Sequence, residues 1–181
     1  MEKRSEIIQV AADLFHKNGY NNVGIQQILN VCGIPKGSFY YYFSSKEKLF
    51  SEVTNFFINQ MFEILDQFPK TIEGLRGFFD LYFSRFKQMG FERGCPLGNC
   101  AIELSDSSKM VREDLMNWTT EFTRRVSEIL KNEGINNSEA VGLSSFILSS
   151  FEGVLLKGKI DKNEQALQEF NYFIFEKLLK F

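Results

Sequence analysis

Apolar residues recur every three or four positions along most of the chain, which is the spacing of one face of an α-helix. Short breaks rich in Gly, Pro, Asn and Ser interrupt this pattern. It predicts helices at residues 2–18, 25–32, 36–42, 46–68, 72–89, 96–106, 109–132, 138–158 and 163–180. The 20 Phe and 3 Pro favour helical packing of aromatic side chains over a β-sandwich. The pattern therefore predicts an all-α protein.

A short turn separates the second predicted helix from a very short third one. Gly33 suits the left-handed backbone conformation that ends a helix, and Pro35 fits the first turn of the next one. In the short helix at 36–42, we expect Phe39 and Phe43 to turn inward together. In helix-turn-helix proteins the second helix enters the major groove of DNA, so this stretch predicts DNA binding.

The helix predicted at 46–68 follows a capping sequence. Ser44-Ser-Lys-Glu47 has Ser at the N-cap and Glu three residues later, which are the two residues of a capping box. A helix that begins beside the DNA-binding segment and continues into the body either transmits a shift between them or is simply a core helix.

The net charge of −2 argues against a protein that coats nucleic acid non-specifically. The charge is nevertheless distributed unevenly along the chain. Residues 1–50 carry six basic and four acidic side chains, and no acidic residue lies between Asp13 and Glu47. The remaining residues carry 15 basic and 19 acidic side chains. A mildly basic N-terminal segment fits a local contact with DNA.

The first fifty residues resemble the N-terminal signature of TetR-family transcriptional regulators. The matching positions are Gly19-Tyr20, Ile28 with Gly33, Lys36-Gly37, Tyr40, Phe43, Lys46-Glu47 and Leu49. Val23, Gly24 and Pro35 replace hydroxyl residues that are common in the family, so those phosphate contacts are absent. Two later segments, at 94–105 and 151–156, also resemble parts of the family's body.

The resemblance implies an N-terminal helix-turn-helix DNA-binding domain at 1–48 and a C-terminal helical ligand-binding and dimerisation domain at 49–181. It also implies residues at or near double-stranded operator DNA. These are Gln26, Lys36, Gly37, Ser38, Tyr40, Tyr41, Tyr42 and Lys46. Tyr and Lys side chains suit phosphates, and Gln26 or Lys36 can read base edges. Tyr42 alternatively packs inside the domain.

Apolar stripes in the body are usually core, but together they can also line a pocket for a small molecule. The candidate ligand-binding residues are Phe57, Met61, Phe79, Tyr82, Phe86, Cys95, Cys100, Trp118 and Phe122. The resemblance implies a repressor that a small apolar or aromatic ligand, of unknown identity, releases from its operator.

The last two predicted helices combine small residues with an apolar stripe, and the resemblance makes them the family's dimerisation pair. The interface residues predicted for a homodimer are Ser149, Gly153, Phe170, Phe173 and Ile174. Glu152 shares a face with apolar residues, where a carboxylate is paired, at a pocket wall or at the edge of an interface. We favour the edge or interface, with a cationic or hydrogen-bonding ligand as a further interpretation.

The alternative function is a repressor that senses oxidants or electrophiles through Cys95 and Cys100. Cys95 precedes Pro96 at a predicted helix start, where backbone N–H groups and the helix dipole favour a thiolate. Five helical residues rise about 7.5 Å, which exceeds the Cα separation of about 4.4–6.8 Å in a disulfide. Both residues can equally be small buried apolar groups.

Other functional classes lack their motifs, so we expect no enzyme, no metal and no cofactor. His16 is the single histidine, is expected on the solvated surface, and would have to pair with a cysteine of another domain. A helical bundle that binds only proteins would not explain the Lys- and Tyr-rich segment without acids. No signal peptide or membrane-spanning run is recognised, and three Cys fit a reducing compartment, so we expect a cytoplasmic protein.

Overall fold

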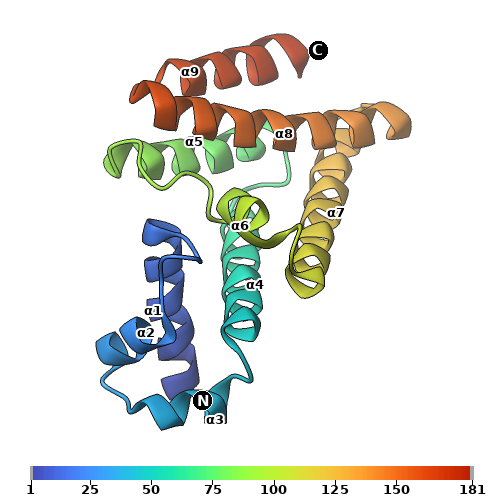
Figure 1. Ribbon diagram of the computed structural model, residues 1–181. Helices are drawn as coiled ribbons and strands as arrows, with labels where there is room; N and C mark the ends of the chain where they lie inside the picture. The colour runs from blue at the N-terminus through green and yellow to red at the C-terminus, as the bar shows by residue number, and fades with distance from the viewer. Residues whose placement is uncertain (1, 180–181) are drawn as a thin grey trace. The chain divides into compact units, whose positions relative to one another are not determined.

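The computed structural model describes residues 2–179, apart from the side chain of Lys36. Every regular element in this part of the chain is a helix, so the predicted all-α class is confirmed. Residue 180, at the end of the last predicted helix, lies outside the described residues. In chain order (Figure 1) the elements are α1 (Glu2–Asn18), α2 (Ile25–Cys32), the 3-10 turn η1 (Lys36–Ser38), α3 (Phe39–Tyr42), α4 (Lys46–Leu65), α5 (Ile72–Gln88), α6 (Pro96–Leu104), α7 (Lys109–Asn132), α8 (Asn137–Asp161), α9 (Gln165–Asn171) and the π-helix η2 (Tyr172–Leu178).

The chain divides into two compact units. The N-terminal unit consists of Met1–Gln60 and Pro96–Met116, and the C-terminal unit consists of Met61–Cys95 and Asn117–Phe181. The division therefore falls inside α4 and inside α7. This division reflects contacts within the chain. The sequence instead predicts a boundary between a DNA-binding domain and a ligand-binding domain after residue 48, and that boundary stays a prediction.

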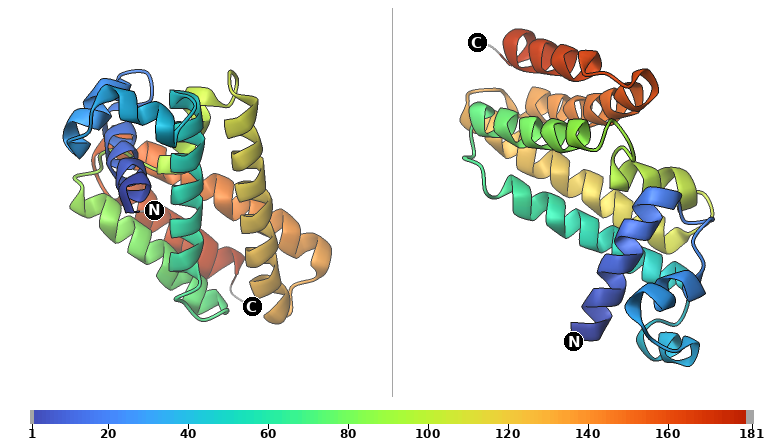
Figure 2. Two further views of the ribbon diagram at one scale, coloured as in Figure 1. Left: turned by 90° about the horizontal axis from the view of Figure 1, so that it is seen from below. Right: turned by 90° about the vertical axis from the view of Figure 1, so that its left-hand side faces the viewer.

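The N-terminal unit buries the inner faces of α1, α2 and α3, and α1 packs directly against α2 (Figure 2). Phe39 and Phe43 are 0% and 2% exposed, which confirms that they turn inward. Gly33 ends α2 with a φ of 65°, the left-handed conformation predicted for it. The turn after α2 therefore presents the opposite face of η1 and α3 to the surface.

Side-chain caps fix where three of the helices begin. The backbone N–H of Lys48 donates to Ser45 Oγ at 3.0 Å, so the cap of α4 is Ser45 and not the predicted Ser44. Thr71 and Asn136 accept the backbone N–H three residues further on, at the starts of α5 and α8. Such caps satisfy N–H groups that have no partner within the helix.

Phenylalanine rings fill the core of the C-terminal unit. Phe79 of α5 is 0% exposed, and its ring centroid lies 5.2 Å from that of Phe151 and 5.0 Å from that of Phe170. These partners belong to α8 and α9, which lie side by side (Figures 1 and 2). Tilted and edge-to-face ring pairs add attraction beyond the burial of their area. The apolar stripes of α5, α8 and α9 therefore meet in one aromatic core.

Candidate DNA-binding surface and ligand site

The outer face of α3 carries two exposed tyrosines. Tyr40 and Tyr41 are 63% and 85% exposed, because Phe39 and Phe43 occupy the inner face of the same short segment. Tyr42 is half-buried, and its ring lies 6.5 Å from that of Phe43. Two neighbouring exposed aromatic side chains on so short a helix suit a surface that contacts a partner, and tyrosine hydroxyls bind phosphate oxygens.

The remaining predicted DNA contacts lie on α2 and in the turn. Gln26 is exposed on α2, where its side-chain amide donates to Asn30 Oδ1 at 2.7 Å. Gly37 is exposed, and a Cβ placed there would have no heavy atom within 4 Å, so the backbone is open to close approach. Ser38 is half-buried. The predicted contact of Lys36 concerns a side chain outside the described structure.

Lys46 has intramolecular contacts at the start of α4. Its Nζ donates to the Tyr20 carbonyl at 2.6 Å and lies 3.9 Å from the centroid of the Tyr20 ring. Burial lowers the pKa of Lys46, while the charge of Glu103 opposes that shift. The ammonium therefore ties α4 to the loop after α1, and its predicted contact with phosphate stays a prediction.

Polar side chains of α6 and α7 brace the helix-turn-helix segment within the N-terminal unit. Glu103 accepts from the Asn21 amide at 3.0 Å, which holds the loop between α1 and α2. Asp114 accepts from Ser51 at 2.6 Å, which holds α4. These contacts could not be predicted from the sequence, because single polar residues far apart in sequence carry no periodic signal.

The nine predicted ligand-binding residues fall in both units. Phe57 and Cys100 belong to the N-terminal unit, and the other seven belong to the C-terminal unit. Within the C-terminal unit, the Trp118 indole N–H donates to Met61 Sδ at 3.1 Å, and both side chains are buried. Most of the nine are packed core residues, and their contact with a ligand stays a prediction. The fully or largely buried members are Met61, Phe79, Phe86, Cys95, Cys100, Trp118 and Phe122.

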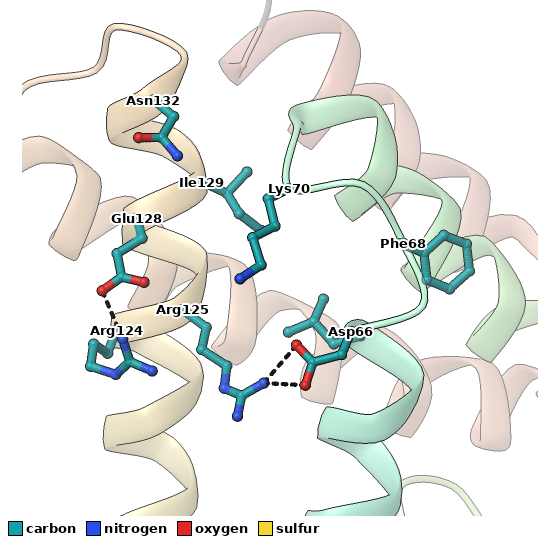
Figure 3. Close-up of a pocket in the computed structure, with 9 residues that line it drawn as sticks. Asp66, Phe68, Lys70, Arg124, Arg125, Glu128, Ile129 and Asn132 are labelled. Carbon is teal, nitrogen blue, oxygen red and sulfur yellow. Dashed lines mark hydrogen bonds and ion pairs between the residues drawn. The ribbon is translucent and has the colours of Figure 1, made fainter.

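A cavity of about 510 Å³ lies in the C-terminal unit between α7 and the loop after α4 (Figure 3). Arg125 Nη1 bonds Asp66 at 2.9 Å across it, and the Lys70 side chain extends from the loop toward α7. None of the nine predicted residues lines it, and its walls are largely charged. This cavity was not predicted from the sequence, because a run of charged positions on a helix such as α7 is typical of a solvated face. Its lining residues are Leu65, Asp66, Phe68, Lys70, Arg124, Arg125, Glu128, Ile129 and Asn132.

The three cysteines are buried, and none of them is in a disulfide. Cys95 lies within hydrogen-bond reach of the Glu152 carboxyl, in the C-terminal unit. Burial raises the pKa of Cys100 to about 12, so this thiol stays protonated at neutral pH. Since the thiolate is the reactive form, burial weighs against Cys100 as a sensor of oxidants or electrophiles.

The predicted dimer-interface residues have two different environments. Ser149, Gly153 and Phe173 are exposed on α8 and η2. Phe170 and Ile174 are each 3% exposed within their own unit, so they offer almost no area to a second copy. The unit's own aromatic core covers their apolar stripe. The sequence pattern showed that this stripe has to be covered, but it did not show whether the cover comes from the same chain or from a second copy.

Helix α8 exposes several large apolar side chains. Phe146, Leu156 and Ile160 are 56%, 56% and 71% exposed. An 18-residue window of α8 has a mean hydropathy of 1.4 and is 33% buried, so by length and composition alone α8 could cross a membrane. Several exposed large apolar side chains on one helix also suit a protein–protein contact.

Metal binding has no structural support in the described residues. No group of three or more His, Cys, Asp or Glu side chains in residues 2–179 is arranged to hold a metal ion. His16 is half-buried, with its ring 5.8 Å from that of Phe57, and is not the fully solvated residue that we expected.

Comparison with known proteins gives two family matches and full-length relatives. The model of bacterial regulatory proteins of the tetR family matches residues 7–53, and the model of the C-terminal domain of LmrA/YxaF-like transcriptional regulators matches residues 71–172. The chain is 28% identical to the HTH-type transcriptional repressor DhaR of Mycobacterium sp. (strain GP1), covering 97% of this chain and 92% of DhaR. It is 29% identical to the HTH-type transcriptional regulator LmrA of Bacillus subtilis (strain 168), covering 92% of this chain and 91% of LmrA.

Solved structures share the fold. The regulatory protein TetR from Rhodobacter sphaeroides superposes with a TM-score of 0.83 at 22% identity, covering 94% of this chain and 96% of that protein. The reduced form of E. coli NemR superposes with a TM-score of 0.82 at 21% identity, covering 97% of both chains.

Proposed function

This chain belongs to the TetR family of bacterial transcriptional regulators, and on that basis we propose that it is a repressor that binds operator DNA as a cytoplasmic homodimer and is released by a small apolar or aromatic ligand. DNA binding and transcriptional regulation are the function of the family, which is not a family of enzymes. The observation that carries the proposal is the pair of exposed tyrosines on α3 above a buried aromatic layer.

In this proposal η1 and α3 lie in the major groove. Tyr40 and Tyr41 donate their hydroxyls to phosphates, and Gly37 lets the backbone approach the DNA. Gln26 and Lys36 read base edges. Ser38 and Tyr42 lie beside the DNA, with Tyr42 also supporting the ring layer beneath.

The homodimer is supported by the exposed apolar faces of α8 and η2. One helix-turn-helix segment offers few contacts, and dimers of such proteins gain affinity by binding two half-sites about one helical turn of DNA apart. Ser149 and Gly153 permit close approach of α8 to a second copy, and Phe173 supplies apolar area from η2. In this dimer the exposed apolar side chains of α8 are covered by the second copy and not by membrane lipid.

The ligand is proposed to act on the aromatic interior of the C-terminal unit. Pockets for small molecules are mostly lined by apolar and aromatic side chains with a few polar groups. The thiol-sensor alternative through Cys95 and Cys100 is less well supported, because burial raises the pKa of Cys100 to about 12.

A genomic footprint of the protein, with and without a panel of metabolites, tests the proposal. We expect protection of a small number of palindromic sites, and loss of protection with at least one metabolite. A protein that protects no specific site would contradict the repressor function. Protection that no metabolite reverses would contradict release by a ligand.

Changing Tyr40 and Tyr41 together to Phe should weaken operator binding without unfolding the protein. Each hydrogen bond to DNA that is removed should cost about 0.5–1.5 kcal/mol. The slope of binding against salt should stay the same, because tyrosine carries no charge. Fluorescence titration of labelled operator at several salt concentrations measures both quantities. Tyr172→Phe is the matched control, and equal weakening by that variant would rule out a specific role for α3.

Lys46→Gln separates a phosphate contact from an internal brace. If the ammonium contacts phosphate, the salt slope should fall by about one unit for each phosphate that is no longer neutralised. Lys131→Gln, on the exposed surface of α7, should leave the slope unchanged. An unchanged slope together with a lower melting temperature for Lys46→Gln would mean that Lys46 acts only on Tyr20.

A further inference from the structure

A carboxyl oxygen in the C-terminal unit is buried without a partner. Glu152 Oε1 on α8 has no accessible surface and accepts no hydrogen bond. In the described residues only one other side-chain atom, Asn171 Oδ1, is in this state. Buried polar groups in native proteins nearly always have partners, because leaving one unpaired costs free energy. Glu152 Oε1 therefore marks a position where a donor from outside the chain would be stabilising.

The surroundings of Glu152 are aromatic and nearly uncharged. The Cys95 thiol lies within hydrogen-bond reach of the carboxyl, and burial raises the pKa of Glu152. Tyr82 of α5 also has a raised pKa, again chiefly through burial, with smaller contributions from Cys95 and Glu152. The Tyr82 ring lies 5.7 Å from that of Phe151, edge to face. Burial thus disfavours the charged forms of both the Glu152 carboxyl and the Tyr82 phenol, and the Tyr82 ring packs against another aromatic ring.

Burial has the largest effect on the Glu152 carboxyl. It raises the pKa of this group, and the hydrogen bond with the Cys95 thiol lowers it. The Arg85 charge acts on the Tyr82 phenol. Glu152 as a whole is half-buried, although its Oε1 atom has no accessible surface. A ligand that pairs with Oε1 therefore has to displace neighbouring side chains.

We propose that Glu152, with Cys95 and the rings of Tyr82 and Phe151, recognises an organic cation, namely a protonated amine attached to an aromatic or apolar body. This inference deepens the proposed function, on which it rests, by naming the class of the releasing ligand. An ammonium group supplies the missing hydrogen bond to Oε1 and favours the ionised carboxylate that burial disfavours. The neighbouring rings attract a cation through their faces and pack against the apolar body.

Three probes of one shape separate the cation from its alternatives: naphthylmethylamine, naphthylmethanol and naphthoate. Their dissociation constants are measured by calorimetry at neutral pH on the full chain without DNA. The amine should bind about tenfold or more tighter than the alcohol, and naphthoate should bind most weakly, because close charge pairs in dry sites are worth more than neutral contacts. In Glu152→Gln, the amine and the alcohol should bind with similar affinity.

The matched control is Glu169→Gln, which removes an exposed carboxylate from α9 and should keep the preference for the amine. Retention of that preference in Glu152→Gln would overturn the proposal. Failure of the amine to bind the wild-type protein would also overturn it. A Glu152→Gln variant that loses dimerisation but keeps its ligand preferences would overturn it as well, since a second copy would then be the partner of Oε1. Because these measurements use no DNA, failure to bind an operator would count against the proposed function and not against the cation site.

Discussion

Replacing Phe173 by glutamate should yield a monomer that binds its operator at least about a hundredfold more weakly than the wild-type protein. Phe173 is 59% exposed on η2, so the new charge is solvated in the monomer but is buried without a partner in the proposed dimer. An uncompensated buried charge costs about 3–5 kcal/mol, and each 1.4 kcal/mol is a factor of ten in affinity. Sedimentation equilibrium gives the dimer dissociation constant, and operator titration gives the DNA affinity.

Gly153→Trp provides an independent change at the same proposed interface. A Cβ at Gly153 would meet no heavy atom within 4 Å in its own chain, so the indole should disturb only a second copy. Ile102→Glu places the same new charge as Phe173→Glu on an exposed apolar position of α6, and that protein should stay a dimer. Persistence of the dimer in both Phe173→Glu and Gly153→Trp would place the interface elsewhere.

Phe79→Ala should lower the free energy of unfolding by about 3–5 kcal/mol, the usual cost of removing a buried phenylalanine ring. Phe79 is 0% exposed, and its ring contacts those of Phe151 and Phe170 on two other helices. Urea denaturation followed by circular dichroism measures the change. Tyr41→Ala removes an exposed ring and should cost less than about 0.5 kcal/mol.

The size of the Phe79 effect also separates two roles for this residue. A ring in a filled core leaves a cavity when it is removed, and the surrounding side chains relax only in part. Removing a ring that lines an open ligand site would disturb the packing of its neighbours much less. A change below about 1 kcal/mol would therefore contradict the core role and strengthen the ligand prediction.

Local features of the sequence sufficed for the helices and for the helix-turn-helix segment. The spacing of apolar residues predicted each helix, because a helix periodicity is a property of neighbouring residues. Gly33 and the pair Phe39 and Phe43 were interpreted correctly for the same reason, since turn conformation and facing depend on local backbone geometry. Helix ends were less accurate. α4 stops at Leu65 and α8 continues to Asp161, three residues from the predicted ends.

The partners of each apolar face were decided by the tertiary structure. Periodicity shows that residues share a face, but the element that covers this face comes from another part of the chain or from another molecule. Phe170 and Ile174 were therefore predicted at an interface, while the unit's own core covers them. Phe173 lies beside them in the sequence and is exposed. No local sequence pattern distinguishes the exposed Phe173 from the buried Phe170 and Ile174.

Polar contacts between distant residues were likewise beyond the sequence. The bond from Lys46 to the Tyr20 carbonyl, and the charged cavity bounded by Asp66 and Arg125, join segments far apart in the chain. A single polar side chain has no periodicity that reveals its partner, and its free energy depends on burial that only packing creates. The sequence alone thus determined the helices, the family and the position of the helix-turn-helix segment. The folded chain decided which side chains are buried, which are paired, and that Glu152 Oε1 has no partner.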